Sequence, residues 1–159
     1  MIVLKNILVA IDFEPASDAA LTYGRALART FGARLHLLHV AENDFLRPSV
    51  TDPYVLKTAM ARRLSDRLTE ADHANGGARA TLEVSDRPAD AITRYAKHEQ
   101  IDLIVMGTHG RTGVTHMLMG SVAEHVVRTA PCPVLTVQHP EHEFVLPDAL
   151  PAIAEMRAS

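Results

Sequence analysis

A glycine-rich stretch, VMGTHGRTGVTHMLMGSVAEHVV over residues 105–127, contains the residue types best suited to binding chemistry. Glycines let backbone amides approach a ligand without a β-carbon in the way, and they tolerate positive φ angles. Loop amides and the amino end of a helix together attract anions, because the helix dipole adds partial positive charge. The stretch therefore predicts a phosphate site, in which Ser121 caps the following helix or binds a phosphate oxygen and Arg111 is available for a terminal phosphate. A plain structural turn is the alternative, since neither GxxxxGK[ST] nor GxGxxG is present.

A carboxylate, Asp12, directly follows the apolar run of residues 7–11. In an open parallel sheet, ligands bind outside the carboxyl ends of the strands, at the point where the strand order reverses. The end of this first strand and the glycine-rich stretch both lie at such ends. The alternative for Asp12 is a structural role as the cap of the next helix.

Strand-like and helical periodicities alternate along the chain. Apolar, β-rich runs predict strands at 2–11, 34–40, 78–84, 102–107 and 132–138. Apolar residues at helical spacing predict helices from Pro15 to Gly32, over 54–73, around 91–96, and from Gly120 to Pro131. This alternation predicts the α/β class, with an open parallel five-stranded sheet and helices on both faces. The predicted domain covers residues 1–138, and 139–159 is expected to be a C-terminal extension whose deletion leaves the core folded.

Length, composition and charge exclude several classes of protein. The 159 residues suit a single domain, and 47% hydrophobic with 22% charged residues is typical of a globular protein. A formal net charge of −3 without a polybasic run predicts neither a nucleic-acid partner nor a membrane partner. Because no apolar run is long enough for a membrane span or a signal peptide, a cytoplasmic location is expected. The single cysteine, Cys132, excludes an internal disulfide and is expected to be a buried, small apolar residue.

Nine histidines raise the question of a metal site. His36 and His39 are three residues apart in a predicted strand, so their side chains face opposite sides of the sheet and cannot share an ion. His139 and His142 lie in the C-terminal extension. We therefore predict no metal site built by the protein itself, and a divalent ion such as Mg²⁺ would accompany bound phosphates.

The order Gly107, two residues, Gly110, nine residues, Gly120-Ser121 resembles the nucleotide-binding signature of the universal stress protein family. Further segments are similar to other parts of that family's domain: ILVAIDFEPASDAAL, LLHVAE, IDLIVMGTHGRTGV and GSVAEHVVRTAPCPVLTV. The resemblance covers about residues 2–138. It implies a Rossmann-like fold of the adenine nucleotide alpha hydrolase type, and within the family this motif marks the ATP-binding branch.

The resemblance also implies roles for individual residues. Asp12, beside Ala10 at the end of the first strand, would accept a hydrogen bond from a ribose hydroxyl. Val40, at the end of the second strand, would bind adenine through its backbone. Met106 and Gly107 would lie beside the ribose and the first phosphate, and the later residues would line the phosphates. With Arg111 added from the loop chemistry, the predicted nucleotide-binding residues are Ala10, Asp12, Val40, Met106, Gly107, Gly110, Arg111, Gly120, Ser121 and Val122.

The function that follows is an ATP-binding regulatory protein of the stress response, with at most slow hydrolysis and no catalytic residue assigned. One alternative is an enzyme on the same scaffold, either a slow ATPase or a nucleotidyl-transfer catalyst, although the HxGH and SGGxDS signatures are missing. A dimeric scaffold that binds no nucleotide is another. The resemblance also implies a homodimer joined through residues 132–138, with Val134, Leu135 and Val137 supplying apolar contacts.

Overall fold

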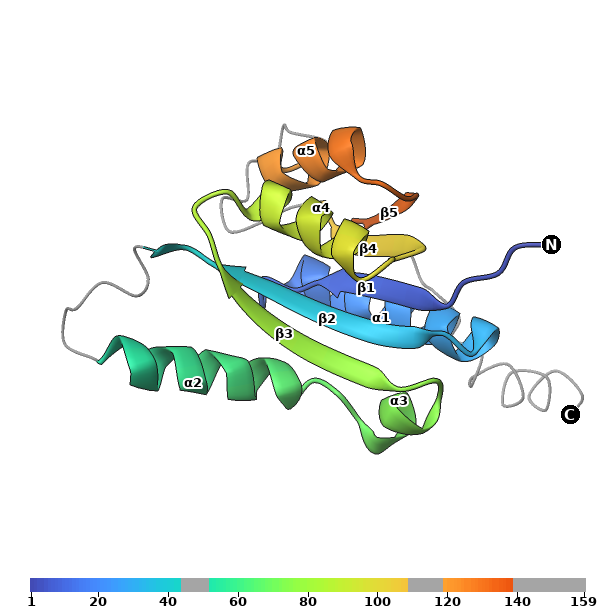
Figure 1. Ribbon diagram of the computed structural model, residues 1–159, viewed down its shortest axis with the longest axis horizontal. Coiled ribbons are helices and arrows are strands. Elements are labelled where there is room, and N and C mark those ends of the chain that lie inside the picture. The colour runs from blue at the N-terminus through green and yellow to red at the C-terminus, as the bar shows by residue number, and fades with distance from the viewer. Residues whose placement is uncertain (44–51, 109–118, 139–159) are drawn as a thin grey trace, which may run out of the picture.

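A computed structural model of the chain describes residues 1–43, 52–108 and 119–138. Within these ranges, all the strand pairs of one five-stranded sheet are parallel, and the strand order is β3-β2-β1-β4-β5 (Figure 1). The strands are β1 (Asn6–Ala10), β2 (Arg34–Ala41), β3 (Ala78–Val84), β4 (Leu103–Gly107) and β5 (Val134–Val137). The predicted α/β class is confirmed.

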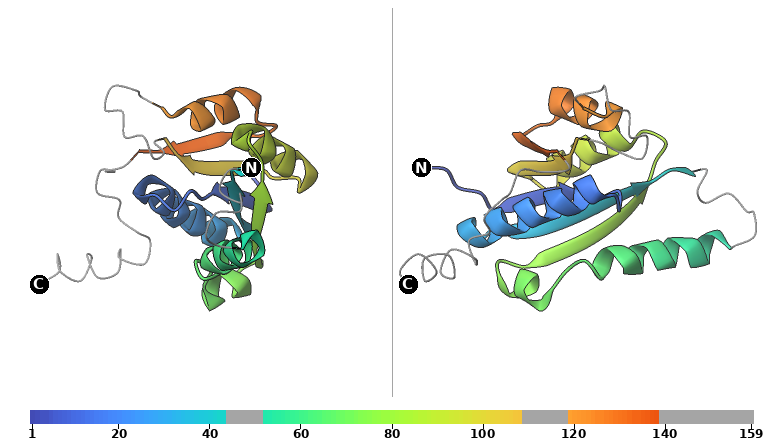
Figure 2. Two further views of the ribbon diagram at one scale, coloured as in Figure 1. Left: turned by 90° about the vertical axis from the view of Figure 1, so that its left-hand side faces the viewer. Right: turned by 180° about the vertical axis from the view of Figure 1, so that it is seen from behind.

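Helices cover both faces of this sheet, as predicted (Figure 2). They are α1 (Pro15–Phe31), α2 (Pro53–Ser65), α3 (Glu70–Ala74), α4 (Pro88–His98) and α5 (Ser121–Thr129). One core joins α1 and Leu64 of α2 to the side chains of Ile7 and Val9 on β1. The other core joins α4 and α5 to Leu8, which points to the opposite face of the same strand. Because β1 is covered on both sides, its sequence is continuously apolar.

The strand order reverses at β1, which pairs with β2 on one side and with β4 on the other. The last β1 residue in both ladders is Ala10, opposite Leu38 on β2 and Met106 on β4. Strand β2 continues to Ala41 and remains paired there only with β3. The carboxyl ends of β1, β2 and β4 therefore surround a crevice, which is the place where open parallel sheets bind ligands.

The predicted helix over 54–73 is wrong in one respect, because the structure divides it into α2 and α3. Thr69 begins the second helix with a capping box, in which its hydroxyl accepts from the Asp72 amide and the Asp72 carboxylate accepts from the Thr69 amide. Arg25 of α1 fixes the break from outside, since it donates to both carboxylate oxygens of Asp72 and to the carbonyl of Arg67. These contacts between distant residues outweigh the local helical pattern.

The first and last strands along the chain are shorter than predicted. Strand β1 begins at Asn6 and not at residue 2, and the side chains of Met1, Ile2 and Val3 are exposed. Strand β5 begins at Val134, because the prolines on either side of Cys132 have no backbone N–H for a ladder. Cys132 therefore precedes the strand, and it is only partly buried against the α4–α5 core, which differs from the predicted buried position.

Candidate functional site

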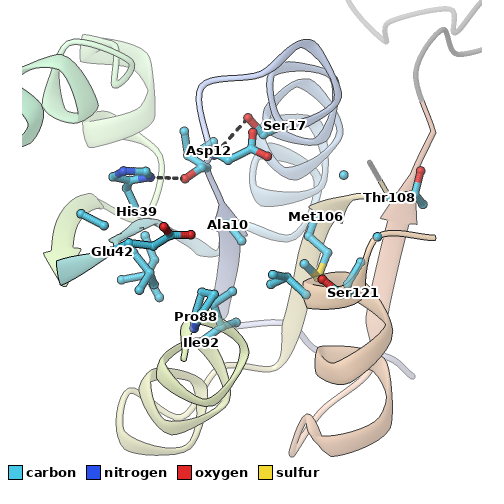
Figure 3. A pocket seen from close by; sticks show the side chains of 18 of the residues that line it. Ala10, Asp12, Ser17, His39, Glu42, Pro88, Ile92, Met106, Thr108 and Ser121 are labelled. Atoms are coloured by element: carbon cyan, nitrogen blue, oxygen red, sulfur yellow. Dashed lines mark hydrogen bonds between the residues drawn. The ribbon is translucent and has the colours of Figure 1, made fainter. Parts of the chain in front are cut away.

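A cavity of about 330 Å³ lies at the carboxyl ends of β1, β2 and β4 (Figure 3). Eight of the ten predicted binding residues line it: Ala10, Asp12, Val40, Met106, Gly107, Gly120, Ser121 and Val122. The other two, Gly110 and Arg111, lie outside the described residues. The fold thus brings together segments that are more than 100 positions apart in the sequence, in one concave site.

Asp12 lies at the turn between β1 and α1, and its side chain is half-buried. Its Oδ1 accepts a hydrogen bond from the Glu14 amide at 2.9 Å, and its own amide donates to the Ser17 hydroxyl at 3.3 Å (Figure 3). Glu14, and not Asp12, is the N-cap residue of α1. The carboxylate therefore shapes the turn before the helix through one oxygen, and no other described residue forms a hydrogen bond with its second oxygen.

The backbone N–H and C=O of Val40 face the cavity on the β1 side of β2, while the strand itself stays in register with β3, where Glu83 lies opposite Val40. Leu38 is the last β2 residue bonded to β1, accepting from the Ile11 amide at 2.9 Å, whereas Ala41 accepts from Ser85 on the β3 side. Because backbone groups alternate along a strand, the N–H and C=O of Val40 point to the side that β1 has already left. The Ile11 carbonyl, which would otherwise receive the next ladder bond, instead accepts from Nδ1 of His39 at 2.6 Å.

The two ends of the glycine-rich segment are fixed in the sheet and at α5. Thr108 donates from its amide to the Val137 carbonyl at 2.9 Å, and its own carbonyl accepts from the Gly120 amide. Gly107 packs against the first turn of α1, where an added β-carbon would lie 2.8 Å from the carbonyl carbon and the β-carbon of Ala16. Glycine is therefore required at 107 for close packing, in addition to any role toward a ligand.

Ser121 was expected either to cap α5 or to bind a ligand, and the structure excludes the first alternative. The N-cap residue is Gly120, which has no side chain with which to cap the helix, so Ser121 does not occupy the capping position. Ser121 is the first helical residue, and its side chain is exposed at the cavity wall. The hydroxyl and the first amides of α5 therefore border the same space, with the positive end of the helix dipole behind them.

Several lining residues were not predicted from the sequence. His39 and Glu42 extend the β2 wall, Met60 comes from α2, and Pro88 with Ile92 comes from the first turns of α4. A signal existed for Glu42, which follows a strand end just as Asp12 does. No local signal indicated Met60, because its place in the wall depends on how α2 packs beside the sheet.

The charge of the described wall is negative. Asp12 and Glu42 are its acidic side chains, and no lysine or arginine of the described ranges lines the cavity. Within this part of the wall, attraction for an anion comes from the amino end of α5. The described residues contain no group of three or more His, Cys, Asp or Glu side chains that could hold a metal ion.

The structure also bears on two other possibilities, a nucleophilic cysteine and a membrane-spanning helix. Cys132 lies outside the cavity, and burial raises the pKa of its thiol, so the thiolate needed for nucleophilic catalysis is disfavoured. In the ranges that the structure describes, no helix has the length and apolar character needed to span a bilayer.

Comparisons with known proteins agree with this geometry. The model of the universal stress protein family matches residues 4–138. A Thermus aquaticus protein, named for its position in the QAH/OAS sulfhydrylase 3′ region, is 36% identical over 142 residues, which cover 84% of this chain and 98% of the relative. UspA from Lactobacillus plantarum has a structure with a TM-score of 0.68 at 29% identity, covering 86% of this chain and 99% of its own.

Two archaeal structures extend the comparison. Protein MJ0577 of Methanocaldococcus jannaschii has a TM-score of 0.71 at 25% identity, covering 91% of this chain and 100% of its own. A universal stress protein from Archaeoglobus fulgidus, solved in complex with dAMP, has a TM-score of 0.57 at 22% identity over 86% of this chain and 99% of its own, which is a likeness of fold. Since the family model and these relatives span nearly all of the described sheet and helices, the chain belongs to the universal stress protein family.

Proposed function

We propose that this protein binds an adenine nucleotide, with ATP as the first candidate, in the cavity at the carboxyl ends of β1, β2 and β4. The observation that carries the proposal is that eight predicted binding residues line a single concave site. They come from three strand ends and the start of α5. This is the edge of a parallel sheet at which nucleotides bind in related architectures.

Each part of a nucleotide has a chemical match in the wall. The N–H and C=O of Val40, which no described residue binds on the β1 side, form a donor beside an acceptor, and this complements the acceptor ring nitrogen and the donor amino group of adenine. The unshared oxygen of Asp12 would accept from a ribose hydroxyl. The amides at the start of α5 and the Ser121 hydroxyl would bind phosphate oxygens, since helix amino ends attract anions.

The proposed role of the nucleotide is regulatory, with slow hydrolysis at most. Of the two carboxylates among the described lining residues, Asp12 and Glu42, the first already accepts from the Glu14 amide. No lysine or arginine is present among these residues to stabilise charge that develops during phosphoryl transfer. A Mg²⁺ ion would be held mainly by the phosphates and by water, as is usual for this ion. The alternative, a slow ATPase or nucleotidyl transferase, predicts repeated turnover by the purified protein.

We also propose a homodimer formed through β5. This strand is at the end of the described sheet, next to β4 only. The Pro133 carbonyl accepts from Ile104 of β4, and the Val137 carbonyl accepts from Thr108, directly after β4. Because backbone groups alternate along a strand, the N–H and C=O of Thr136 point away from β4. An unpaired strand edge of this kind can add a strand from a second copy of the chain.

Calorimetric titration with ATP tests the nucleotide proposal. Replacing Asp12 with Asn keeps an oxygen for the Glu14 amide but removes the charge, so we expect the Kd for ATP to rise about tenfold, in line with the loss of one charged hydrogen bond. Asp66→Asn is the matched control, because Asp66 is exposed at the end of α2 and does not line the cavity. Gly120→Val, which adds a branched side chain to the phosphate end, is expected to abolish binding.

Mass spectrometry of small molecules released from the freshly purified, denatured protein identifies a retained ligand. Stoichiometric ATP or ADP would support the proposal, and thermal melts of each variant would separate lost binding from lost folding. An empty site in the wild type, together with no heat on titration with ATP, would contradict it. Many rapid turnovers that are lost in Asp12→Asn while binding persists would replace the regulatory function with an enzymatic one.

A further inference from the structure

Phe13 occupies an unusual backbone conformation directly beside the proposed ribose contact. Its φ angle is +66°, in the left-handed region that is unfavourable for a bulky residue and for which glycine is suited. Such a conformation persists only when surrounding contacts hold it, and it occurs often at ligand sites. Phe13 adjoins Asp12 in the chain, so whatever holds Phe13 also determines where the Asp12 carboxylate points.

The contacts that hold Phe13 come from two sides. The guanidinium of Arg63, on α2, lies 4.1 Å from the centre of the Phe13 ring, and that of Arg67 lies 5.6 Å away. The imidazole of His39 packs against the ring with centroids 4.7 Å apart and planes inclined by 54°. His39 also donates to the Ile11 carbonyl, so it holds the backbone on the other side of Asp12 as well (Figure 3).

Helix α2 has few other anchors. Of its 13 residues, the structure buries only Leu64, while Tyr54 and Val55 at its start are largely exposed. Met60 lies one helical turn before Arg63 and forms part of the cavity wall. Helix α2 is therefore joined to the site twice, by Met60 directly and by Arg63 through the Phe13 ring.

We propose that Arg63 and Phe13 are positioning residues for the nucleotide site, and that α2 and the ligand are coupled through them. The cation on the Phe13 ring holds the turn of residues 11–14, so that the Asp12 carboxylate faces the ribose. By thermodynamic reciprocity, a ligand that engages Asp12 stabilises the packing of α2 by the same free energy. The inference rests on the proposed nucleotide function, and it makes α2 the element whose packing the nucleotide regulates.

Affinities for ATP and for 2′,3′-dideoxy-ATP test the positioning role, because the second nucleotide lacks the hydroxyls that Asp12 would bind. Loss of an exposed cation–π contact is worth about 0.5–1 kcal/mol, so Arg63→Ala should raise the Kd for ATP about two- to fivefold. The same variant should leave the Kd for dideoxy-ATP nearly unchanged. Arg63→Lys should restore part of the affinity for ATP, since lysine also places a cation on an aromatic face.

Two further variants sharpen the test. Phe13→Asn removes the ring but tolerates the left-handed conformation, so it should reduce the preference for ATP over dideoxy-ATP without loss of folding. Arg62→Ala is the matched control, because Arg62 is exposed on the same helix and makes no contact with the Phe13 ring. It should bind both nucleotides as the wild type does.

Hydrogen exchange measures the reciprocal effect on α2. Saturating ATP should slow exchange of the amides in residues 53–65 of the wild type and of Arg62→Ala, and should slow it less in Arg63→Ala. Unchanged ATP affinity in Arg63→Ala, or an equal loss for ATP and dideoxy-ATP, would overturn the coupling while leaving the nucleotide function intact. A wild-type protein that binds neither nucleotide would overturn both proposals.

Discussion

His36 and His39 show how two like residues on one strand acquire different roles. His39 faces the cavity and donates to the Ile11 carbonyl. His36 points to the opposite face of the sheet, where its Nδ1 lies 3.0 Å from the hydroxyl of Tyr95 on α4. His36 is 2% exposed, and its Nε2 has no hydrogen-bond partner among the described residues. Burial lowers the pKa of His36, because a protonated imidazole here would lose hydration without gaining an acceptor for its second N–H.

This lowered pKa predicts a pH dependence of stability. Above about pH 6.5 both the folded and the unfolded forms carry neutral His36, and the residue adds no pH dependence. As the pH falls below that value, the unfolded chain binds a proton that the folded protein does not, so the free energy of unfolding decreases. We expect Tm to fall between pH 7 and pH 5.5, and to fall less in His36→Gln than in the wild type.

His98→Gln is the control for this prediction, because the His98 side chain is 83% exposed on α4. It should retain the wild-type dependence of Tm on pH. A wild-type slope in His36→Gln would mean that His36 is not the group responsible.

At the scale of elements, α1 owes its close approach to the sheet to Gly24. A β-carbon at this position would lie 2.3 Å from Cγ2 of Val9, far inside normal contact distance. Both Val9 and Gly24 are buried, so no solvent-filled space is available for the extra atom. The packing between α1 and β1 therefore overrides the helix propensity that would favour alanine.

Gly24→Ala is expected to lower the free energy of unfolding by about 1–3 kcal/mol, the usual cost of overpacking a core. In a Val9→Ala background, which removes the clashing Cγ2, the same change should be neutral or stabilising by up to about 1 kcal/mol through helix propensity. Urea unfolding of the four proteins in this cycle measures both values. Equal effects of Gly24→Ala in the two backgrounds would show that the contact with Val9 is not the cause.

The break between α2 and α3 is a second property of elements, and it bears on the site. Arg25 and Asp72 form an ion pair at 2.8 Å, with the Asp72 side chain 2% exposed. Burial alone would raise the pKa of Asp72, but the hydrogen bonds from Arg25 and from Thr69 outweigh burial, and the pKa is lowered. This buried pair fixes the end of α2, and therefore the positions of Met60 and Arg63 beside the cavity.

At the scale of the whole molecule, the proposed β5 dimer can be tested without disturbing the core. Thr136→Pro removes a backbone N–H that points away from β4, and proline is tolerated on edge strands. If β5 pairs with a second copy, this variant should sediment as a monomer while the wild type sediments as a dimer. Analytical ultracentrifugation with a thermal melt of each protein measures both properties. A wild-type monomer, or a Thr136→Pro dimer that remains folded, would exclude pairing through this strand.

The sequence alone determined the parallel α/β sheet, because strands buried on both faces must be continuously apolar, and such runs are visible locally. Eight predicted residues also line the cavity. The glycines, Ser121 and Asp12 are predicted from loop chemistry and strand ends, whereas Ala10, Val40, Met106 and Val122 are predicted from the resemblance to the universal stress protein family. The roles of these residues toward a nucleotide remain predictions, as do Gly110 and Arg111, which lie outside the described ranges.

Only the tertiary structure decided the features that depend on residues far apart in the chain. The division of α2 from α3 needs Arg25, which is 47 positions before Asp72. The ring of Phe13, whose backbone is left-handed, is packed between Arg63 and His39, and the place of Met60 in the wall depends on the packing of α2. Local propensity cannot encode such contacts, because their free energy exists only once the sheet has brought the segments together.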